Sequence, residues 1–242
     1  MFNTTGVQNP GTAPVVPPTT VPAPAPTPAP EPTVPAPAPT PAPEPTVPAP
    51  APTPAPATPQ CGGLDVTVNL NLGQVPTSGN DVILGTPGND RIVAGDGFDV
   101  ICGEDGDDTI IAGNGQDVVF GGAGDDIIEA GQGKDWVDGE SGDDTIAGGK
   151  GKDTLLGGSG DDAIRGNEGT DTIDGNAGND ILRGGQKADT INGGSGDDTL
   201  IGGTRPDILD GGSGVDSYVG GGGLDTCSVV SALGETATGC EI

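Results

Sequence analysis

An apolar residue stands at every ninth position between Ile83 and Cys227, in a stretch rich in glycine and aspartate. With one residue on each side it can form a very short strand, whose apolar side chain points inward while its neighbours point outward. Glycines before each aspartate permit φ > 0, which a tight turn lined by backbone carbonyls requires. The pattern therefore predicts short strands that alternate with glycine-rich turns. The apolar positions are Ile83, Ile92, Ile101, Ile110, Val119, Ile128, Val137, Ile146, Leu155, Ile164, Ile173, Leu182, Ile191, Leu200, Leu209, Tyr218 and Cys227.

Aspartates follow the same period, two residues before each apolar position, seventeen times without an insertion or a deletion. Two nonapeptides make one coil with two turns and two strands. Each turn then stacks on the turn eighteen residues away, and coils lie about 4.8 Å apart. One edge, called here the odd edge, carries Asp81, Asp99, Asp117, Asp135, Asp153, Asp171, Asp189, Asp207 and Asp225. The even edge carries Asp90, Asp108, Asp126, Asp144, Asp162, Asp180, Asp198 and Asp216.

The repeat at residues 121–129 reads Gly-Gly-Ala-Gly-Asp-Asp-Ile-Ile-Glu and fits the nonapeptide GGxGxDxUx, in which U is apolar. On this motif the chain resembles the RTX, or hemolysin-type, calcium-binding repeat family. The resemblance implies an all-β, right-handed parallel β-roll with eighteen residues per coil. It also implies that each calcium ion lies between two turns eighteen residues apart and binds both aspartates and carbonyls of positions one to four. Glycines expected in such sites are Gly121, Gly122, Gly124, Gly148, Gly149, Gly151, Gly157, Gly158, Gly160, Gly193, Gly194 and Gly196.

Each edge is a ladder of carboxylates that needs a cation. Two unit charges roughly 5 Å apart repel by about 3 kcal/mol at an effective dielectric constant of 20. Calcium takes six to eight carbonyl and carboxylate oxygens in flexible geometry, and stacked turns offer both. Nine odd-edge and eight even-edge aspartates leave fifteen gaps, so up to about 15 calcium ions are expected.

Two turns depart from the pattern, because Lys187 and Arg205 replace the fourth-position glycine before odd-edge aspartates. Each places a cation and a Cβ where a permissive residue is expected. They touch three odd-edge gaps, so about twelve well-formed sites are expected. Alternatively, each cation supplies the positive charge itself. Glu104 and Glu140 replace only the second glycine, which is a milder change.

The composition limits both the kind of partner that the protein can bind and the kind of core that it can form. The net charge of −28 argues against nucleic acid and for cation binding. With 2% aromatic residues and 47 glycines, the core must be a thin aliphatic ladder. Low hydrophobicity and high net charge favour disorder when calcium is absent.

The first sixty residues contain no Lys or Arg and repeat the unit VPAPAPTPAPEPT from Val21. Alternating proline favours an extended polyproline II rod, so this disordered linker is either a spacer away from a surface or a simple tail. No signal peptide is recognisable in the first twenty residues, and no stretch is long enough to cross a membrane. The expected domains are linker 1–60, N-terminal cap strand 61–80, roll 81–228 and C-terminal cap 229–242.

Four cysteines, Cys61, Cys102, Cys227 and Cys240, permit three pairings. Cys102 and Cys227 lie about seven coils apart, roughly 34 Å, whereas a disulfide joins Cα atoms within ~7 Å. We expect Cys61 to pair with Cys102, and Cys227 with Cys240. Paired cysteines indicate an oxidising compartment, and hence an extracellular protein that is secreted or associated with the cell surface.

Residues 64–72 alternate between apolar and polar side chains, which predicts a half-buried strand that caps the N-terminal coil. The outward positions of the first odd-edge strands are also apolar, from Val82 and Leu84 to Phe120 and Trp136. We expect residues 61–72 to cover part of this strip, pinned by the Cys61–Cys102 bridge. The rival expectation is that the segment plugs the end of the roll.

The sequence thus predicts an extracellular calcium-binding protein, expected to be a monomer, with a structural or surface-interaction role towards a cell wall or another surface protein. Threonines at positions 154, 172 and 190 stack at eighteen-residue spacing, which leaves an ice-binding or adhesin surface as an alternative. The chain has no histidine, so Ser-His and Cys-His catalysis is excluded. A non-catalytic module of an exported enzyme is the remaining alternative.

Overall fold

The computed structural model describes residues 61, 64, 66–70, 73–229 and 234–241. They belong to the second of two units into which the chain divides, Met1–Ala51 and Pro52–Ile242. The predicted linker of residues 1–60 lies outside the described residues. So do positions 65, 71 and 72 of the predicted cap strand, and residues 230–233 and 242 near the C-terminus.

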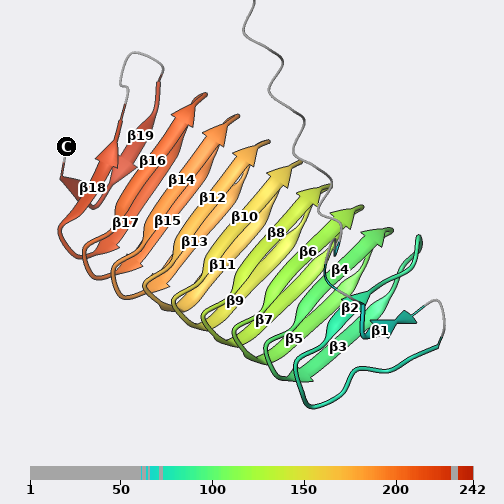
Figure 1. The fold of residues 1–242 in the computed structure, drawn as a ribbon. Coiled ribbons are helices and arrows are strands. Elements are labelled where there is room, and N and C mark those ends of the chain that lie inside the picture. The colour runs from blue at the N-terminus through green and yellow to red at the C-terminus, as the bar shows by residue number, and fades with distance from the viewer. Residues whose placement is uncertain (1–60, 62–63, 65, 71–72, 230–233, 242) are drawn as a thin grey trace, which may run out of the picture. The chain divides into compact units, whose positions relative to one another are not determined.

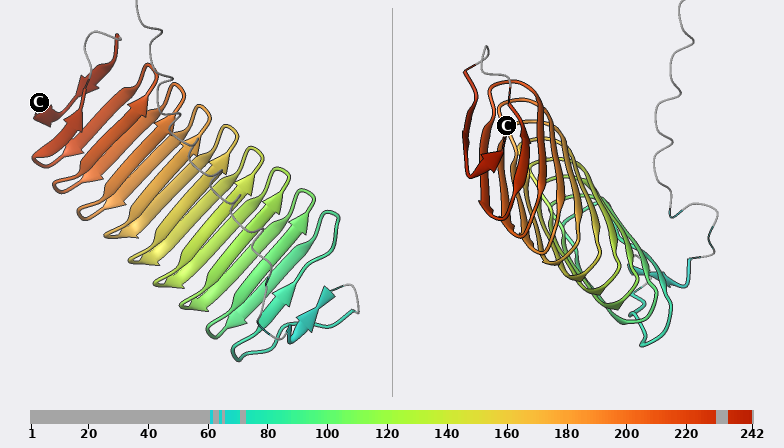
Figure 2. Two further views of the ribbon diagram at one scale, coloured as in Figure 1. Left: turned by 45° about the horizontal axis from the view of Figure 1, so that its top comes forward. Right: turned by 90° about the vertical axis from the view of Figure 1, so that its left-hand side faces the viewer.

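Short strands build two parallel sheets that face each other, and each coil contributes one strand to each sheet (Figure 1). Sheet A has eleven strands in the order β1-β2-β4-β6-β8-β10-β12-β14-β16-β18-β20, and sheet B has nine in the order β19-β17-β15-β13-β11-β9-β7-β5-β3. Figure 2 shows the successive coils stacked along one axis. The strands are β1 (Val68–Asn69), β2 (Val82–Leu84), β3 (Arg91–Asp96), β4 (Val100–Asp105), β5 (Thr109–Gly115), β6 (Val118–Ala123), β7 (Ile127–Gly133), β8 (Trp136–Ser141), β9 (Thr145–Gly151), β10 (Thr154–Ser159), β11 (Ala163–Gly169), β12 (Thr172–Ala177), β13 (Ile181–Gln186), β14 (Thr190–Ser195), β15 (Thr199–Thr204), β16 (Ile208–Ser213), β17 (Ser217–Gly222), β18 (Asp225–Ser228), β19 (Thr236–Thr238) and β20 (Cys240–Glu241).

The register confirms the predicted coil of eighteen residues. In sheet A, Leu155 pairs with Val137 on one side and with Ile173 on the other. In sheet B, Ile110 pairs in the same way with Ile128. The chain is therefore an all-β parallel solenoid with two nonapeptides per coil, as the period predicts.

The core is the predicted single column of apolar side chains. All seventeen periodic positions are buried, and none is more than 5% exposed. A coil of eighteen residues thus contributes two large apolar side chains, helped near the N-terminal end by three small ones, Ala94, Ala112 and Ala130. Two such side chains are few against the conformational entropy of eighteen ordered residues. The turns must therefore supply much of the stability.

The N-terminal end of sheet A is closed by β1, in which Val68 pairs with Ile83 and lies in the core at 2% exposure. This strand has only two residues, far fewer than the alternating segment suggests. Leu64 and Val66 are 53% and 38% exposed, so they do not share the buried face of Val68. The prediction that the segment lies over the outer strip is wrong for residues 66–70, which extend the sheet edge to edge through a Thr67 N to Val82 O bond of 3.0 Å.

Both sheets continue at the C-terminal end with short strands. Thr236 of β19 pairs with Ser217 of β17, which extends sheet B. Cys240 of β20 pairs with Asp225 of β18, which extends sheet A. Among the described residues no helix is long and apolar enough to cross a membrane.

Both predicted disulfides are present. Cys61 and Cys102 are joined with a Cα–Cα distance of 6.0 Å, and Cys227 and Cys240 with one of 5.8 Å. Cys102 follows the inward-facing Ile101 and so points out from sheet A, yet it is only 2% exposed. Cys61 therefore covers this one position of the outer face.

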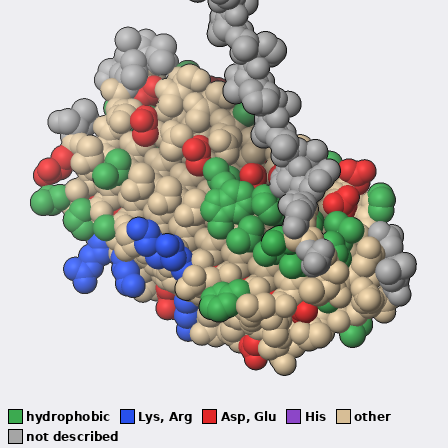
Figure 3. Space-filling view, viewed as in Figure 1, with side chains coloured by type: hydrophobic (Ala, Val, Ile, Leu, Met, Phe, Trp, Pro, Cys, Tyr) green, Lys and Arg blue, Asp and Glu red, His purple; other side chains and the backbone are tan. Residues whose placement is uncertain are grey.

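The rest of the outer strip stays partly exposed. Phe120 and Trp136 on neighbouring strands pack edge to face, with ring centroids 5.1 Å apart. Hydrophobic side chains gather over β6 and β8 in the space-filling view (Figure 3). Thr154, Thr172 and Thr190 do stack in register on the same sheet, but Trp136 and Ile208 end the row.

Candidate metal centre

The periodic aspartates line the two edges of the roll where each turn enters a strand. All are buried except Asp90, which is half-buried. The backbone N–H of one aspartate donates to Oδ1 of the aspartate eighteen residues later, as from Asp126 to Asp144 at 2.8 Å. The same bond recurs along both edges at 2.7–3.0 Å. Each carboxylate therefore pairs within its own edge.

The second carboxylate oxygen is left without a protein partner. Among the described residues, Oδ2 is buried and accepts no hydrogen bond at fifteen of the seventeen aspartates, from Asp99 and Asp108 through Asp225. A buried carboxylate oxygen without a donor is costly, so a positive group is needed at each of these places.

At twelve of the fifteen aspartates the orphaned oxygen points beneath the first-position glycine of its own turn. The first position is an alanine in the other three turns, those of Asp99, Asp117 and Asp135. A Cβ on Gly148 would lie 2.8 Å from Asp153 Oδ2 and 3.1 Å from the carbonyl oxygen of Gly166, one coil further on. Gly121, Gly157 and Gly193 have the same neighbours, an aspartate Oδ2 and a first-position carbonyl of the next coil. A carboxylate and a carbonyl oxygen thus converge inside the turn where glycine leaves room.

The remaining predicted glycines shape the turn. The second-position residues Gly122, Gly149, Gly158 and Gly194 have φ between +103° and +122°, and the fourth-position residues Gly124, Gly151, Gly160 and Gly196 have φ between +127° and +149°. These angles suit glycine alone, because they lie beyond the left-handed helical region that other residues can enter.

The donors fit calcium. Carboxylate and carbonyl oxygens are the hard ligands that this ion prefers. The described residues hold no group of three His, Cys, Asp or Glu side chains that could bind a metal by themselves. A metal ion in the turns would therefore depend on backbone carbonyls as well as on aspartates.

The buried carboxyls also favour the neutral form when no cation is present. Burial raises the pKa of Asp144 to about 8, although the N–H of Asp126 opposes the shift. Burial likewise raises the pKa of Asp162 and of Asp189 to about 7. The neighbouring ladder carboxylates add to each of these shifts.

The turns of Lys187 and Arg205 have a different backbone. Their φ values are +75° and +83°, whereas glycines with positive φ at the fourth position range from +117° to +159°. Both turns have moved into the left-handed helical region, which a side chain tolerates at some cost. Burial raises the pKa of Asp171 to about 6, and Lys187 opposes this shift. The φ values agree with the expected strain in both turns, and the effect of Lys187 on Asp171 agrees with its acting as a partial counterion.

The first aspartate of each edge is satisfied by protein. Oδ2 of Asp81 accepts the N–H and hydroxyl of Thr77 at 2.7 and 3.0 Å. Oδ2 of Asp90 accepts the N–H of Thr86 at 2.6 Å. The sequence gives a signal for this, because threonine replaces the second glycine in these two turns.

The last rung of the even edge was not recognised in the sequence. Thr236 pairs with Ser217, so Glu235 stands beside Asp216 as a further carboxylate, after one inserted residue. Tyr218 replaces the usual aliphatic residue. Its hydroxyl accepts the N–H of Gly211 at 3.1 Å, donates to Ser228 O at 2.7 Å and lies 3.4 Å from Glu235 Oε2. The tyrosine at an apolar position was the available signal.

Tyr218→Phe is expected to destabilise the C-terminal end. The Gly211 N–H and the Ser228 carbonyl lose a partner, which costs about 1–3 kcal/mol of unfolding free energy. Urea unfolding in saturating calcium measures the loss, and Tyr218→Leu, which restores an aliphatic rung, should lose at least as much. An unchanged urea midpoint for Tyr218→Phe would mean that the hydroxyl network contributes nothing.

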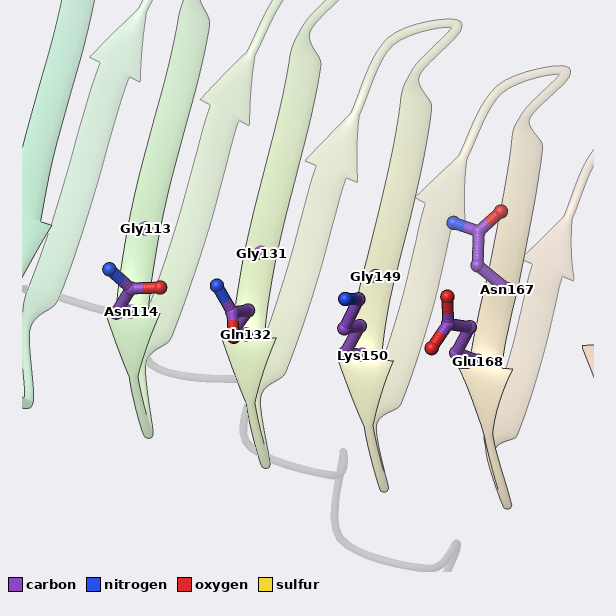
Figure 4. A pocket seen from close by; sticks show the side chains of 8 residues that line it. All are labelled: Gly113, Asn114, Gly131, Gln132, Gly149, Lys150, Asn167 and Glu168. Carbon is purple, nitrogen blue, oxygen red and sulfur yellow. The ribbon is translucent and has the colours of Figure 1, made fainter.

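A separate open groove crosses sheet B where three of the four second-position residues are glycines and the fourth is Asn167 (Figure 4). It lies over β5, β7, β9 and β11 and is bordered by a row of polar third-position side chains. Its lining residues are Gly113, Asn114, Gly131, Gln132, Gly149, Lys150, Asn167 and Glu168.

Comparison with known proteins agrees with this geometry. Overlapping matches to the model of the RTX calcium-binding nonapeptide repeat run from residue 77 to residue 227, more than half of the chain. No curated protein matches the chain. Since the matched segment is the solenoid with its two aspartate ladders, the chain belongs to the family of RTX calcium-binding nonapeptide repeat proteins.

Proposed function

We propose that this protein is an extracellular β-roll that folds around a ladder of calcium ions and serves a structural or surface-interaction role. The fifteen buried carboxylate oxygens that lack a protein partner carry the proposal. Two disulfides are consistent with an oxidising, calcium-rich environment. The proposed domains are linker 1–60, cap 61–80, roll 81–228 and cap 229–242.

Each ion is proposed to lie between two aspartates eighteen residues apart, with carbonyls of the adjoining turns as further ligands. The seventeen aspartates and the twelve glycines named from the sequence are the proposed ligand and turn residues. In the gap between Asp81 and Asp99 and in the gap between Asp90 and Asp108, one carboxylate oxygen already accepts a hydrogen bond from Thr77 or Thr86. Thirteen of the fifteen gaps therefore have an orphaned oxygen on both aspartates. Three of these adjoin Lys187 or Arg205, which leaves about ten regular sites.

Replacing Lys187 and Arg205 with glycine is expected to raise the number of bound calcium ions by up to three. Glycine lets both turns return to the φ of the other repeats and removes a competing positive charge. Calcium content after equilibrium dialysis, measured by atomic emission, checks this. Lys134→Gly and Lys152→Gly, at fifth positions, remove the same charge elsewhere and should leave the count unchanged. An unchanged count in the first variant would show that its turns already bind fully.

The roll is proposed to be non-catalytic. Its acidic side chains on the two edges are held by the ladder and would be metal ligands, so they are not available as general acids or bases. Repeat rolls of this kind are typically non-catalytic. The three threonine rungs make a narrow surface, and a thermal-hysteresis assay would reveal any ice binding. The apolar strip on sheet A is the stronger candidate for contact with another segment.

A further inference from the structure

The two edges of the roll differ in the charge of their exposed turn residues, leaving the ladder aspartates aside. The five residues before each odd-edge aspartate contain five of the eight Lys and Arg residues of the whole chain, all of them exposed. These cations are Lys134, Lys150, Lys152, Lys187 and Arg205. The corresponding even-edge turns contain eight acidic residues and no Lys or Arg. In Figure 3 the Lys and Arg side chains in view gather along one edge of the roll.

The exposed acids of the even edge form a row with fixed spacing. The fifth-position aspartates Asp125, Asp143 and Asp161 follow one another at eighteen-residue intervals. Asp125 Oδ1 accepts the N–H of Asp143 at 2.9 Å, and Asp143 Oδ1 accepts the N–H of Asp161 at 2.8 Å. These bonds hold the carboxylates one coil apart, about 4.8 Å. The row therefore loses little side-chain entropy when it pairs with cations.

The odd-edge cations have no such attachment. Within the part of the chain that the structure describes, none of their side chains makes a hydrogen bond or an ion pair. Only two acidic residues, Asp96 and Glu168, share the odd-edge turns with them. These cations are therefore available to acids outside their own turns.

The heights of the two sets of charges along the roll axis match. Odd-edge and even-edge turns alternate along the chain, so neighbouring turns differ by half a coil, about 2.4 Å, in height. The turn that carries Lys152 lies between those of Asp143 and Asp161, and the turn that carries Lys134 lies between those of Asp125 and Asp143. A parallel second copy at the same height would therefore present an acid close to the level of each cation.

The match continues towards the C-terminal end. Lys187 precedes and Arg205 follows the even-edge turn of Asp197 by half a coil. Asp197 is exposed, and its Oδ1 accepts the N–H of Val215 at 2.8 Å. Both edges belong to the same roll, so their charges share one spacing and stay in register over the whole contact.

We propose that calcium-loaded copies of this protein associate side by side, with the odd edge of one copy against the even edge of the next. A second copy is the occupant because its acids repeat with the same spacing as the cations. Each exposed ion pair contributes only about 0–1 kcal/mol, but several pairs form together in one contact. The contact leaves one free odd edge and one free even edge, so rows of copies can grow. This inference departs from the expectation of a monomer.

The association depends on calcium and so rests on the proposed function. The net charge of −28 makes calcium-free copies repel one another. Thirteen calcium ions, one for each gap with orphaned oxygens on both aspartates, would bring the net charge to about −2. The exposed charges of the two edges then decide whether copies attract.

Sedimentation velocity of the full chain in saturating calcium tests the association. At low salt the average mass should rise with protein concentration. In about 1 M sodium chloride, where the Debye length is roughly 3 Å, the protein should sediment as a monomer. A wild type that has its strand signal but sediments as a monomer at every concentration in low salt would overturn this inference alone. Loss of the strand signal in calcium would overturn the calcium proposal as well.

Two variants, each altered at one edge, identify the surfaces. Lys134→Glu/Lys152→Glu changes the odd edge, at fifth positions that hold Gln116 and Thr170 in other turns. Asp125→Asn/Asp143→Asn changes the even edge, where Asn179 already occupies a fifth position. Each variant alone should associate about tenfold more weakly than wild type. An equal mixture should form one-to-one pairs and stop there, because only one native odd edge and one native even edge remain to meet.

The matched control is Arg91→Glu/Arg165→Glu. It makes the same change of charge as the lysine variant, but at exposed positions on β3 and β11 of sheet B. This variant should associate as wild type does. Equal weakening by the control and by the lysine variant would mean that net charge alone governs the association, and it would overturn the assignment of the two edges. A mixture of the two edge variants that stays monomeric would overturn it too.

Discussion

Chelation of calcium is expected to abolish the strand signal of the roll, and millimolar calcium is expected to restore it. Each coil has only two large core side chains, whereas Oδ2 is orphaned at fifteen aspartates. Ions that bind only the folded state stabilise it by mass action, and neighbouring coils share turns, so the transition should be steep and cooperative. Midpoints of about 10⁻⁴ to 10⁻³ M are typical of extracellular calcium modules.

Circular dichroism during a calcium titration measures this transition. Magnesium at equal concentration is the control, because its smaller octahedral shell fits carbonyl-lined turns poorly. A strand signal that persists unchanged in chelator would contradict the proposed coupling of folding to calcium. The test should be run with the disulfides intact, so that both ends of the roll start from the same covalent state.

Acid is expected to act in opposite directions on the calcium-free and the calcium-loaded chain. Burial raises the pKa of Asp144 to about 8 and that of Asp162 to about 7, well above the usual value for aspartate. A carboxyl with a raised folded pKa stabilises the fold below its unfolded pKa of about 3.9, and this contribution is lost as pH rises through the folded pKa. Without calcium, strand content should therefore be greatest near pH 4 and disappear between about pH 6 and 8.

With calcium, the same protons compete with the ion. Where the calcium-free chain is folded with protonated ladder carboxyls, one proton displaced for each ion bound raises the midpoint calcium concentration about tenfold for each unit of pH decrease. Calcium titrations at pH 5, 6, 7 and 8 test the direction and the slope. A midpoint that is independent of pH would show that the ladder carboxyls are already ionised in the calcium-free chain.

Two neighbouring substitutions distinguish the effect of losing a ladder carboxylate from the effect of losing a surface charge. Asp144→Asn keeps the shape but holds the position neutral, so it should bind less calcium and flatten the pH dependence. Asp143→Asn removes the same charge from the exposed adjacent position. Its partner Asp161 N–H needs only a side-chain oxygen, and Asn179 already accepts the corresponding bond from Asp197. This variant should titrate as wild type.

The periodic part of the fold could be predicted because the nonapeptide occurs seventeen times without an insertion or a deletion. The period of nine implies the register, the inward column and the pairing of aspartates within one edge, and the strand spacing limits which cysteines can meet. The sequence predicted strain in the turns of Lys187 and Arg205, but it could not give their φ angles. A φ angle depends on the surrounding turn as well as on the residue.

The ends could not be predicted in the same way, because an end coil has a neighbour on one side only. Alternation in residues 64–72 suggested one long strand, yet β1 has two residues. Among the described residues of this segment only Val68 is fully buried, and Leu70 packs partly buried against the core. Glu235 and Tyr218 complete the last turn through an inserted residue that breaks the period. At the other end Thr77 and Thr86 donate hydrogen bonds to the first aspartate of each edge. The threonine at the second position is visible in the sequence, but the pattern of the repeat does not predict these bonds.

The Cys61–Cys102 bridge also determines how a pulling force would enter the molecule. Tension applied through residues 1–60 passes from Cys61 across the disulfide into β4, bypassing the forty residues between the two cysteines. The end strands β1, β2 and β3 lie inside this closed loop, so they would carry no load. A chain held by its N-terminal segment would therefore resist unravelling from its first coil, and its extension under force would lack the length of that loop until the bridge is reduced.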